Sequence, residues 1–299
     1  MRKLLVATPA HGEIFYTPYV RSLLRLQRAL IARKDSMSHM VVSFFETSEA
    51  RNFLLTHWFD RTDASHLLFV DADMGFEPEL VFGMLALSKP VVGVIYPKRQ
   101  LDMPRLASLA AKGEPPVRAV ARAHDFIIRP LRGRQPRRVK GFLEVAACGA
   151  GILLIDRSCV AQMLKKLPEL SDPSAKRTMP LAKDLDRLIR AFDAVTVDST
   201  RLSDDFAFCH RWHQLCGGEI WANVDAPVTH LGLHRFSARY ADASGPHIMM
   251  VQSSAPVRVG RTKSAAPAAK PEPKAAPRTA PATASVSEKK GGNGKRPRR

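Results

Sequence analysis

Short apolar runs alternate with amphipathic segments along the first hundred residues of this 299-residue chain. Four apolar runs have the length and character of strands: 3–8, 40–45, 66–70 and 91–96. Three segments between them carry apolar residues at helical spacing: 17–31, 48–61 and a segment that opens at Pro78. This β-α-β-α-β-α-β order is typical of an α/β fold, in which right-handed crossovers join a largely parallel sheet.

The second half of the chain predicts two further helices and three further strands. In chain order they are strands 142–147 and 152–155, helix 157–167, a helix capped by Ser203, and strand 219–224. Residues 168–200 show no clear period. Because ligands of parallel sheets bind beyond the carboxyl ends of the strands, the residues that follow each strand are the first candidates for a site.

Positive charge is concentrated in two segments and divides the chain. The net charge is +18, and residues 98–140 hold twelve Lys/Arg against three Asp/Glu. Residues 253–299 hold twelve Lys/Arg against two Glu, with many Ala and Pro and few large apolar residues. Such a composition cannot offset the entropy of ordering, so we expect one folded domain over 1–252, interrupted by a basic insertion at 98–140, and a disordered tail over 253–299.

The basic tail predicts contact with polyanions such as nucleic acid, anionic lipid headgroups or acidic glycans. A solvated tether without a dedicated partner is the alternative interpretation of the same composition. No apolar run approaches the ~20 residues that a membrane span needs, and no secretion signal is recognised. The four cysteines are sparse, which favours reduced thiols. We therefore expect a cytoplasmic protein, with peripheral contact at the inner membrane face through the tail as one option.

Two aspartates follow the third apolar run, in the segment Asp71-Ala72-Asp73. Carboxylates at i and i+2 beyond a buried strand can share one Mg²⁺ or Mn²⁺ ion, which then binds substrate phosphates. Two solvated aspartates at a strand end would have the same sequence. In a parallel-sheet context we favour the metal site.

Two other groups of residues offer catalytic chemistry. Asp204 and Asp205 follow Ser203 in the first turn of a predicted helix, where carboxylates either cap the helix or act as a general base. His230 and His234 flank Gly232 and could supply a metal ligand from the far side of a cleft. A zinc site formed by these histidines with Cys209 and Cys216 is disfavoured, because six residues separate the cysteines.

Taken in order, these residues resemble GT-A-fold glycosyltransferases, in particular bacterial and phage proteins related to family 2. The resemblance runs from Lys3 to about Phe236 and rests on these segments: Thr8-Pro9, Ala50-Arg51-Asn52, Asp71-Ala72-Asp73, Gly149-Ala150-Gly151, Ser203-Asp204-Asp205-Phe206 and His230 to Phe236.

The resemblance implies a GT-A-like, Rossmann-type α/β sheet and a nucleoside-diphosphate sugar as donor. It implies that the nucleotide and its phosphates are bound by Thr8, Pro9, Arg51, Asn52, Asp71 and Gly149. It implies a Mn²⁺ or Mg²⁺ ion held by Asp71 and Asp73, with His230 or His234 as a further ligand. It places Asp205 where inverting members keep their catalytic base, with Asp204 beside it in place of the family's frequent Glu.

The function expected from the sequence is therefore metal-dependent transfer of a sugar to a hydroxyl acceptor, with inversion. The basic insertion 98–140 lies where an acceptor-side flap could sit, which suggests an anionic acceptor. Two alternatives stay open. One is a phosphotransfer hydrolase with an aspartyl nucleophile, although that class carries its Asp-x-Asp motif on the first strand. The other is a polyanion-binding protein with an inactive sheet domain, although no interleaved aromatic residues mark a base-stacking surface.

Overall fold

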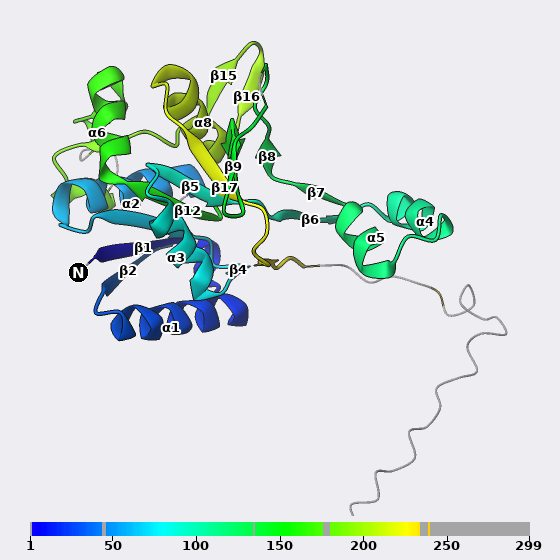
Figure 1. Ribbon diagram of the computed structural model, residues 1–299. Helices are drawn as coiled ribbons and strands as arrows, with labels where there is room; N and C mark the ends of the chain where they lie inside the picture. The colour runs from blue at the N-terminus through cyan, green and yellow to red at the C-terminus, as the bar shows by residue number, and fades with distance from the viewer. Residues whose placement is uncertain (1, 44–45, 134, 176–179, 234–238, 240–299) are drawn as a thin grey trace, which may run out of the picture. The chain divides into compact units, whose positions relative to one another are not determined.

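The structure is a computed structural model and describes residues 2–43, 46–133, 135–175, 180–233 and 239. Its centre is an eight-stranded mixed sheet flanked by helices on both faces (Figure 1). The strands lie in the order β2 (Ser36–Val42), β1 (Lys3–Pro9), β3 (His66–Val70), β12 (Ile152–Asp156), β5 (Val91–Val94), β17 (Ile220–Asn223), β10 (Phe142–Val145) and β9 (Arg138–Val139). β12 and β10 run antiparallel to both of their neighbours, and the other strands share one direction.

The expected α/β class is therefore confirmed, and the sheet is more mixed than the order of the first elements indicates. β12 inserts between β3 and β5 and pairs with both. An apolar run carries no information about strand direction, so the sequence pattern could not reveal this reversal. The second strand begins earlier than expected, at Ser36 instead of Met40. Its pairing with β1 starts with Ser36 opposite Lys3, so backbone hydrogen bonds extend the strand over residues such as Ser38 and His39 that face solvent and interrupt the apolar pattern.

Successive side chains of each strand face opposite sides of the sheet, and this alternation builds two separate cores. Leu4, Val6, Leu68 and Val70 pack against helices α1 (Thr17–Ala32) and α3 (Pro78–Leu87). The alternate residues Leu5, Ala7, Leu67 and Phe69 pack against α2 (Thr47–Arg61), α6 (Arg157–Lys166) and α8 (Asp204–His210). Figure 1 shows α1 on one side of the sheet and α2, α6 and α8 on the other.

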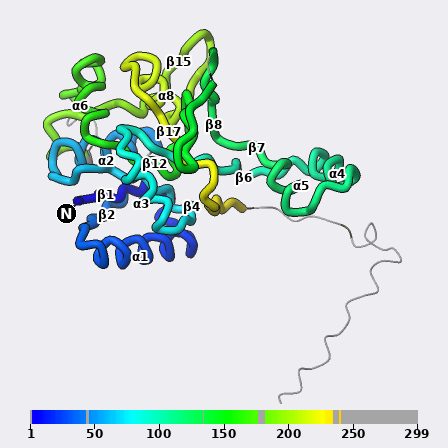
Figure 2. Tube along the Cα trace, in the orientation of Figure 1, coloured from blue at the N-terminus to red at the C-terminus, as the bar shows by residue number. Residues whose placement is uncertain are grey.

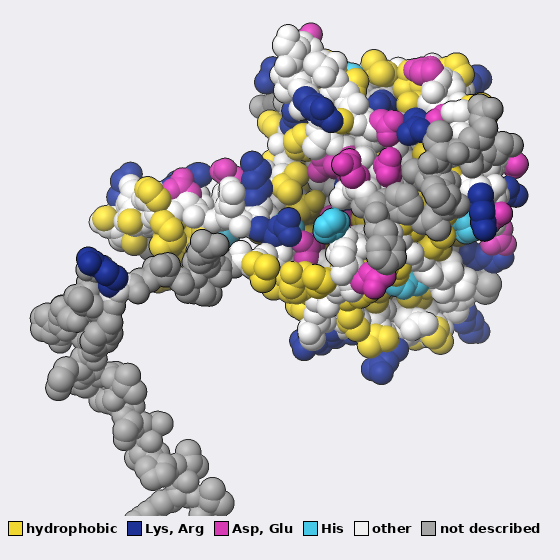
Figure 3. All heavy atoms as spheres, turned by 180° about the vertical axis from the view of Figure 1, so that it is seen from behind, with side chains coloured by type: hydrophobic (Ala, Val, Ile, Leu, Met, Phe, Trp, Pro, Cys, Tyr) yellow, Lys and Arg dark blue, Asp and Glu magenta, His cyan; other side chains and the backbone are white. Residues whose placement is uncertain are grey.

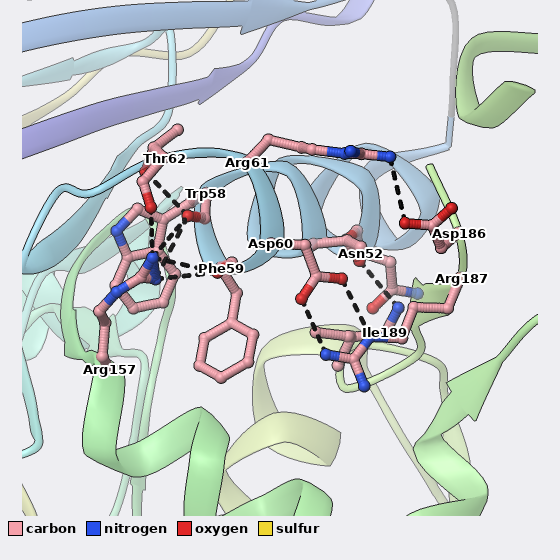
Figure 4. A network of polar contacts seen from close by, with 11 residues as sticks. Asn52, Trp58, Phe59, Asp60, Arg61, Thr62, Arg157, Asp186, Arg187 and Ile189 are labelled. Atoms are coloured by element: carbon pink, nitrogen blue, oxygen red, sulfur yellow. Dashed lines mark hydrogen bonds and ion pairs between the residues drawn. The ribbon is translucent and has the colours of Figure 1, made fainter. Parts of the chain in front are cut away.

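The segment that the sequence left unread, 168–200, runs partly along α2 (Figure 4). Thr56 of α2 accepts a hydrogen bond from the backbone nitrogen of Ile189 at 2.8 Å, and Asp60 forms a two-pronged ion pair with Arg187 at 2.8 and 2.9 Å. β14 (Leu188–Ile189) thereby brings Phe192 against Phe208 of α8, with ring centroids 4.7 Å apart. This packing fixes α8, and with it the acidic pair at its start.

Residues of the basic insertion fold as an arm. A ribbon of β6 (Pro97–Leu101) and β7 (His124–Phe126) carries two short helices, α4 (Met103–Ala111) and α5 (Pro116–Arg122), which lie side by side at its end (Figure 2). Asp102 caps α4 by accepting from the backbone nitrogen of Arg105 at 2.9 Å. In the part of the chain that the structure describes, no helix is long and apolar enough to cross a membrane.

Candidate functional site

The Asp71-Ala72-Asp73 segment lies at the edge where the parallel strands β1 and β3 end. The backbone nitrogen of Asp71 donates to the carbonyl of Gly151, before β12, at 2.9 Å. The next residues form β4 (Met74–Gly75), which pairs with β18 (Thr229–His230) so that His230 lies opposite Met74. This pairing brings two segments that are about 155 residues apart in the sequence to one site.

Arg51 of α2 joins the two acidic motifs. Its Nη2 donates to both carboxylate oxygens of Asp71, at 2.9 and 3.0 Å, and its Nη1 donates to the carboxylate of Asp204. Arg51 is only 4% exposed. Burial lowers the pKa of this guanidinium, but Asp71, Asp204 and Asp205 outweigh burial and raise the pKa overall. A permanent positive charge is therefore fixed between the strand β3 edge and the start of α8.

Asp73 has different partners from Asp71. Its Oδ2 accepts from Nη1 of Arg99 at 2.9 Å and lies 3.6 Å from Nε2 of His230, whereas its Oδ1 is buried without a hydrogen-bond partner among the described residues. Nδ1 of His230 lies 2.8 Å from the carbonyl oxygen of Pro97. A carbonyl oxygen only accepts, so Nδ1 carries a proton and Nε2 is the atom of the ring that is directed at Asp73.

A cleft of about 350 Å³ opens beside these aspartates. Its charged lining consists of Asp71, Asp73 and Arg99. Its apolar lining includes Pro9, Ala10, Ile14 and Val42, together with Tyr16, whose backbone nitrogen donates to the carbonyl of Ala72 at 3.1 Å. We call this space the aspartate cleft. It combines charged and apolar lining, as sites for molecules that carry both a ring and phosphates require.

Two further hollows border the aspartate cleft. One, of about 630 Å³, is lined by Ser203 and Asp204 and shares His11 and Thr47 with the aspartate cleft; we call it the Ser203 cleft. The other, of about 460 Å³, is lined by Lys98, His230 and Leu233 and shares Arg99. Arg99, from β6 at the base of the arm, therefore separates two cavities while it bonds Asp73.

Four of the six residues expected to bind the nucleotide are buried: Thr8, Arg51, Asn52 and Gly149. The hydroxyl of Thr8 lies 2.6 Å from that of Tyr19, and both lie near His39. Burial raises the pKa of Tyr19 to about 12, although the Thr8 hydroxyl opposes this. Asn52 donates to Asp193 at 2.6 Å and accepts from the backbone nitrogen of Phe192 at 2.8 Å. These contacts fix the strand edge and the 192–193 segment around the cleft.

Gly149 packs against the ring of Tyr96, and a Cβ at this position would overlap the Tyr96 hydroxyl. That hydroxyl accepts from the backbone nitrogen of Gly151 at 2.9 Å, and burial raises the Tyr96 pKa. Tyr96 also meets His230 edge-on, with ring centroids 5.1 Å apart. The glycines therefore allow Tyr96 to lie beneath the site and support His230.

Asp204 and Asp205 differ in what they contact. Asp204 lines the Ser203 cleft and is bonded to Arg51. Oδ1 of Asp205 accepts from the Ser203 hydroxyl and from the backbone nitrogen of Phe206, the latter at 2.8 Å. No ion pair of Asp205 is found in the described part of the chain.

His234 lies outside the described residues, as do Arg235, Phe236 and the tail. Within the described ranges, no group of three or more His, Cys, Asp or Glu side chains is placed to hold a metal ion. Of the predicted metal ligands, Asp73 and His230 are the two whose side chains meet in the described residues, and Asp71 is turned toward Arg51. All four cysteines are free and buried.

No family model and no curated protein matches this sequence. Solved structures with a similar course of the chain include A197 from STIV, at 14% identity and a TM-score of 0.41, covering 77% of this chain and 86% of that one. Another is a Drosophila β-1,4-galactosyltransferase 7 mutant in complex with manganese, UDP-Gal and xylobiose, at 11% identity and a TM-score of 0.37, covering 84% and 78%. A third is S. aureus TarS with UDP-GlcNAc, at 11% identity and a TM-score of 0.36, covering 79% and 60%. At these values the likenesses assign no function, which rests on the site itself.

Arg99 and the apolar lining of the cleft are the parts of the site that the sequence did not indicate. Arg99 is one of twelve Lys/Arg in a basic segment, and no pattern singles it out. Ile14 and Tyr16 precede α1 in a stretch without periodicity. The proximity of Tyr96-Pro97 to the carboxyl end of the fourth strand was the one available indication that the neighbourhood of Arg99 faces the site.

Proposed function

We propose that this protein is a glycosyltransferase that takes a sugar from a nucleoside-diphosphate sugar and transfers it to a hydroxyl acceptor. The observation that carries the proposal is the aspartate cleft, which is lined by Asp71, Asp73, Arg99 and several apolar residues, with His230 3.6 Å from the Asp73 carboxylate. The resemblance of the sequence to GT-A-fold glycosyltransferases supports it.

The donor fits the cleft by its two halves. The nucleoside lies against the apolar side chains of Ile14 and Val42, and the diphosphate lies beside Asp71 and Asp73. Arg99 is 54% exposed in its side chain and can move from Asp73 to a phosphate, because a guanidinium binds either oxyanion with the same geometry. Arg51 is already committed to two carboxylates and keeps the floor of the cleft in place.

A divalent cation fits the residues present. The buried Oδ1 of Asp73 lacks a partner among the described residues, and Nε2 of His230 is directed at the same carboxylate. Mn²⁺ and Mg²⁺ are commonly bound by few protein groups and take their remaining ligands from phosphate oxygens and water. One carboxylate and one imidazole therefore suit these ions. When bound, the ion neutralises charge on the departing diphosphate. Asp73 and His230 would hold it, and Asp71, paired with Arg51, would position Asp73.

The acceptor enters from the Ser203 cleft, which meets the aspartate cleft at His11 and Thr47. Of the two acidic residues, Asp204 is tied to Arg51 by an ion pair, and its role is to orient the start of α8. Asp205 has one carboxylate oxygen bonded by Ser203 and Phe206, and no hydrogen bond of the other is found among the described residues; we assign this second oxygen as the acceptor of the proton. We assign the attack to the face of the sugar opposite the diphosphate, which gives inversion.

Calorimetric titration with UDP and GDP, with Mn²⁺ and after EDTA, tests the donor site. We expect one nucleotide to bind only with the metal, and Asp73→Asn to abolish that binding. Asp63→Asn, at an aspartate with a 77% exposed side chain paired with Lys3, is the matched control and should bind as the wild type does. Absence of metal-dependent binding of UDP, GDP and the other common nucleoside diphosphates would overturn the proposal.

The stereochemistry is tested separately. NMR of the product formed from a donor of known anomeric configuration should show inversion, and Asp205→Asn should lower kcat by at least about a hundredfold while nucleotide affinity is unchanged. Retention of configuration would remove the role given to Asp205 without affecting the donor site.

A further inference from the structure

Helix α1 has an outward face that is both apolar and basic. Its buried face packs Leu23, Leu26 and Leu30 against the sheet. About 110° around the helix from that face, Val20, Leu24 and Ile31 are 42%, 51% and 66% exposed. At about 100° per residue these three side chains fall within an arc of about 40°, so they form one stripe along the helix. Scattered single leucines on a surface need no explanation, but an aligned stripe on one helix does.

Arginines border this stripe. Arg21, Arg25 and Arg28 lie on its flank, and no acidic residue occurs between Thr17 and Ala32. Arg25 is paired with Glu77 next to α3, whereas no ion pair of Arg21 or Arg28 is found among the described residues. Figure 3 shows hydrophobic and Lys/Arg side chains side by side along the lower edge of the body, where Figure 1 places α1. We call the stripe with Arg21 and Arg28 the α1 surface.

Charge and shape together define the occupant of the α1 surface. A second copy of the chain would bring like charges together, because the arginines flank the stripe along its length. A nucleic acid would use the arginines but would leave the aliphatic side chains without bases to stack on. An anionic bilayer satisfies both, since aliphatic side chains enter the boundary between headgroups and acyl chains while arginines contact the phosphates.

We propose that the α1 surface docks on anionic phospholipid membranes, with the helix parallel to the membrane plane. The docking surface itself does not depend on the proposed function.

Depth-dependent fluorescence on the full chain tests the proposal. A polarity-sensitive fluorophore is attached to the Leu24→Cys variant, in which the four native thiols are buried and the new one is accessible. With vesicles of phosphatidylglycerol and phosphatidylcholine we expect a blue shift and quenching by spin-labelled acyl chains, and neither with phosphatidylcholine alone. The matched control places the fluorophore on Val117→Cys, an 85% exposed aliphatic position on α5 of the arm, where we expect no quenching.

A second set of variants separates this surface from the basic tail, which also attracts anionic vesicles. Leu24→Gln with Ile31→Gln, and Arg21→Gln with Arg28→Gln, alter only exposed side chains, and their thermal unfolding should match the wild type. We expect each pair to weaken vesicle binding at least about tenfold at fixed salt.

Three results would overturn the proposal. The first is vesicle binding without quenching at position 24. The second is quenching at position 117 instead, which would assign the contact to the arm. The third is a shift at position 24 with oligonucleotides and none with vesicles, which would assign the surface to nucleic acid.

Discussion

Nη2 of Arg51 bonds both carboxylate oxygens of Asp71, at 2.9 and 3.0 Å. Arg51 comes from the first half of α2, and Asp71 follows strand β3. Because Nη1 of the same guanidinium bonds Asp204, one buried cation holds the two acidic motifs of the chain at a fixed separation. Within the site two arginines thus pair with three aspartates: Arg51 with Asp71 and Asp204, and Arg99 with Asp73.

Removing the buried cation should be costly. We expect Arg51→Met to lower the free energy of unfolding by about 3–5 kcal/mol, because Asp71 and Asp204 lose their partner while they stay largely buried. Chemical denaturation monitored by circular dichroism measures this loss. Arg61→Met is the control: its pair with Asp186 is exposed, so the change should stay within about 1 kcal/mol. Equal effects of the two substitutions would contradict the bridging role of Arg51.

Arg99 competes with any cation for Asp73. If the proposed metal site is correct, Arg99→Met should tighten Mn²⁺ binding in the absence of nucleotide by about fivefold, the equivalent of about 1 kcal/mol for a partly exposed ion pair. Electron paramagnetic resonance of free Mn²⁺ measures the affinity. Arg105→Met on the arm, whose contact with Asp125 is 3.8 Å, should leave the affinity unchanged. Weaker Mn²⁺ binding in Arg99→Met would mean that Arg99 does not occupy the cation position.

Asp172 of β13 (Ser171–Asp172) makes stability depend on pH. Asp172 accepts from the Ser174 hydroxyl at 2.6 Å and from Nε of Arg190 at 2.7 Å, and these contacts lower its pKa from the ordinary 3.8 to about 2. Since the folded pKa lies below the unfolded value, the stabilisation is complete above the unfolded pKa and is lost as the pH falls toward 2. Asp172→Asn should therefore cost about 1–2 kcal/mol at pH 7 and progressively less between pH 4 and pH 2.

Urea denaturation at a series of pH values measures this dependence. Asp186→Asn, at an aspartate with a 90% exposed side chain, should show little effect at any pH and serves as the control. If Asp172→Asn lowers the free energy of unfolding by the same amount from pH 7 to pH 2, the carboxylate charge does not stabilise the fold. Asp172 would then contribute only through the packing and hydrogen bonds that asparagine cannot reproduce.

The close approach of Gly149 to Tyr96 predicts opposite effects of one substitution at two glycines. Gly149→Ala should destabilise the protein by about 1–3 kcal/mol, since the added methyl overlaps the Tyr96 hydroxyl. Gly83→Ala, within α3 and in ordinary contact with Phe142 at 3.5 Å, should be neutral or stabilising by up to about 1 kcal/mol. Differential scanning calorimetry of both variants decides the matter, and a destabilised Gly83→Ala with an unaffected Gly149→Ala would refute the packing argument.

Local sequence pattern alone predicted the α/β class. Apolar residues recur with a period of 2 in strands and of 3.6 in helices, and a few residues are enough to show either period. It also placed Asp71 and Asp73 after a buried strand, since the apolar run 66–70 ends there. The basic character of 98–140 was visible in the composition, but its fold as a ribbon with two helices was not.

Tertiary structure decided which of these residues meet. The antiparallel insertion of β12 between β3 and β5 sets Gly151 beside Asp71, and the pairing of β4 with β18 sets His230 beside Asp73. The binding of Arg51 to Asp204 spans 153 positions of the chain. Contacts over such separations depend on strand order and direction, which hydrophobic periodicity does not encode. The sequence by itself therefore determined the elements and the candidate carboxylates, and only the packed sheet determined their partners.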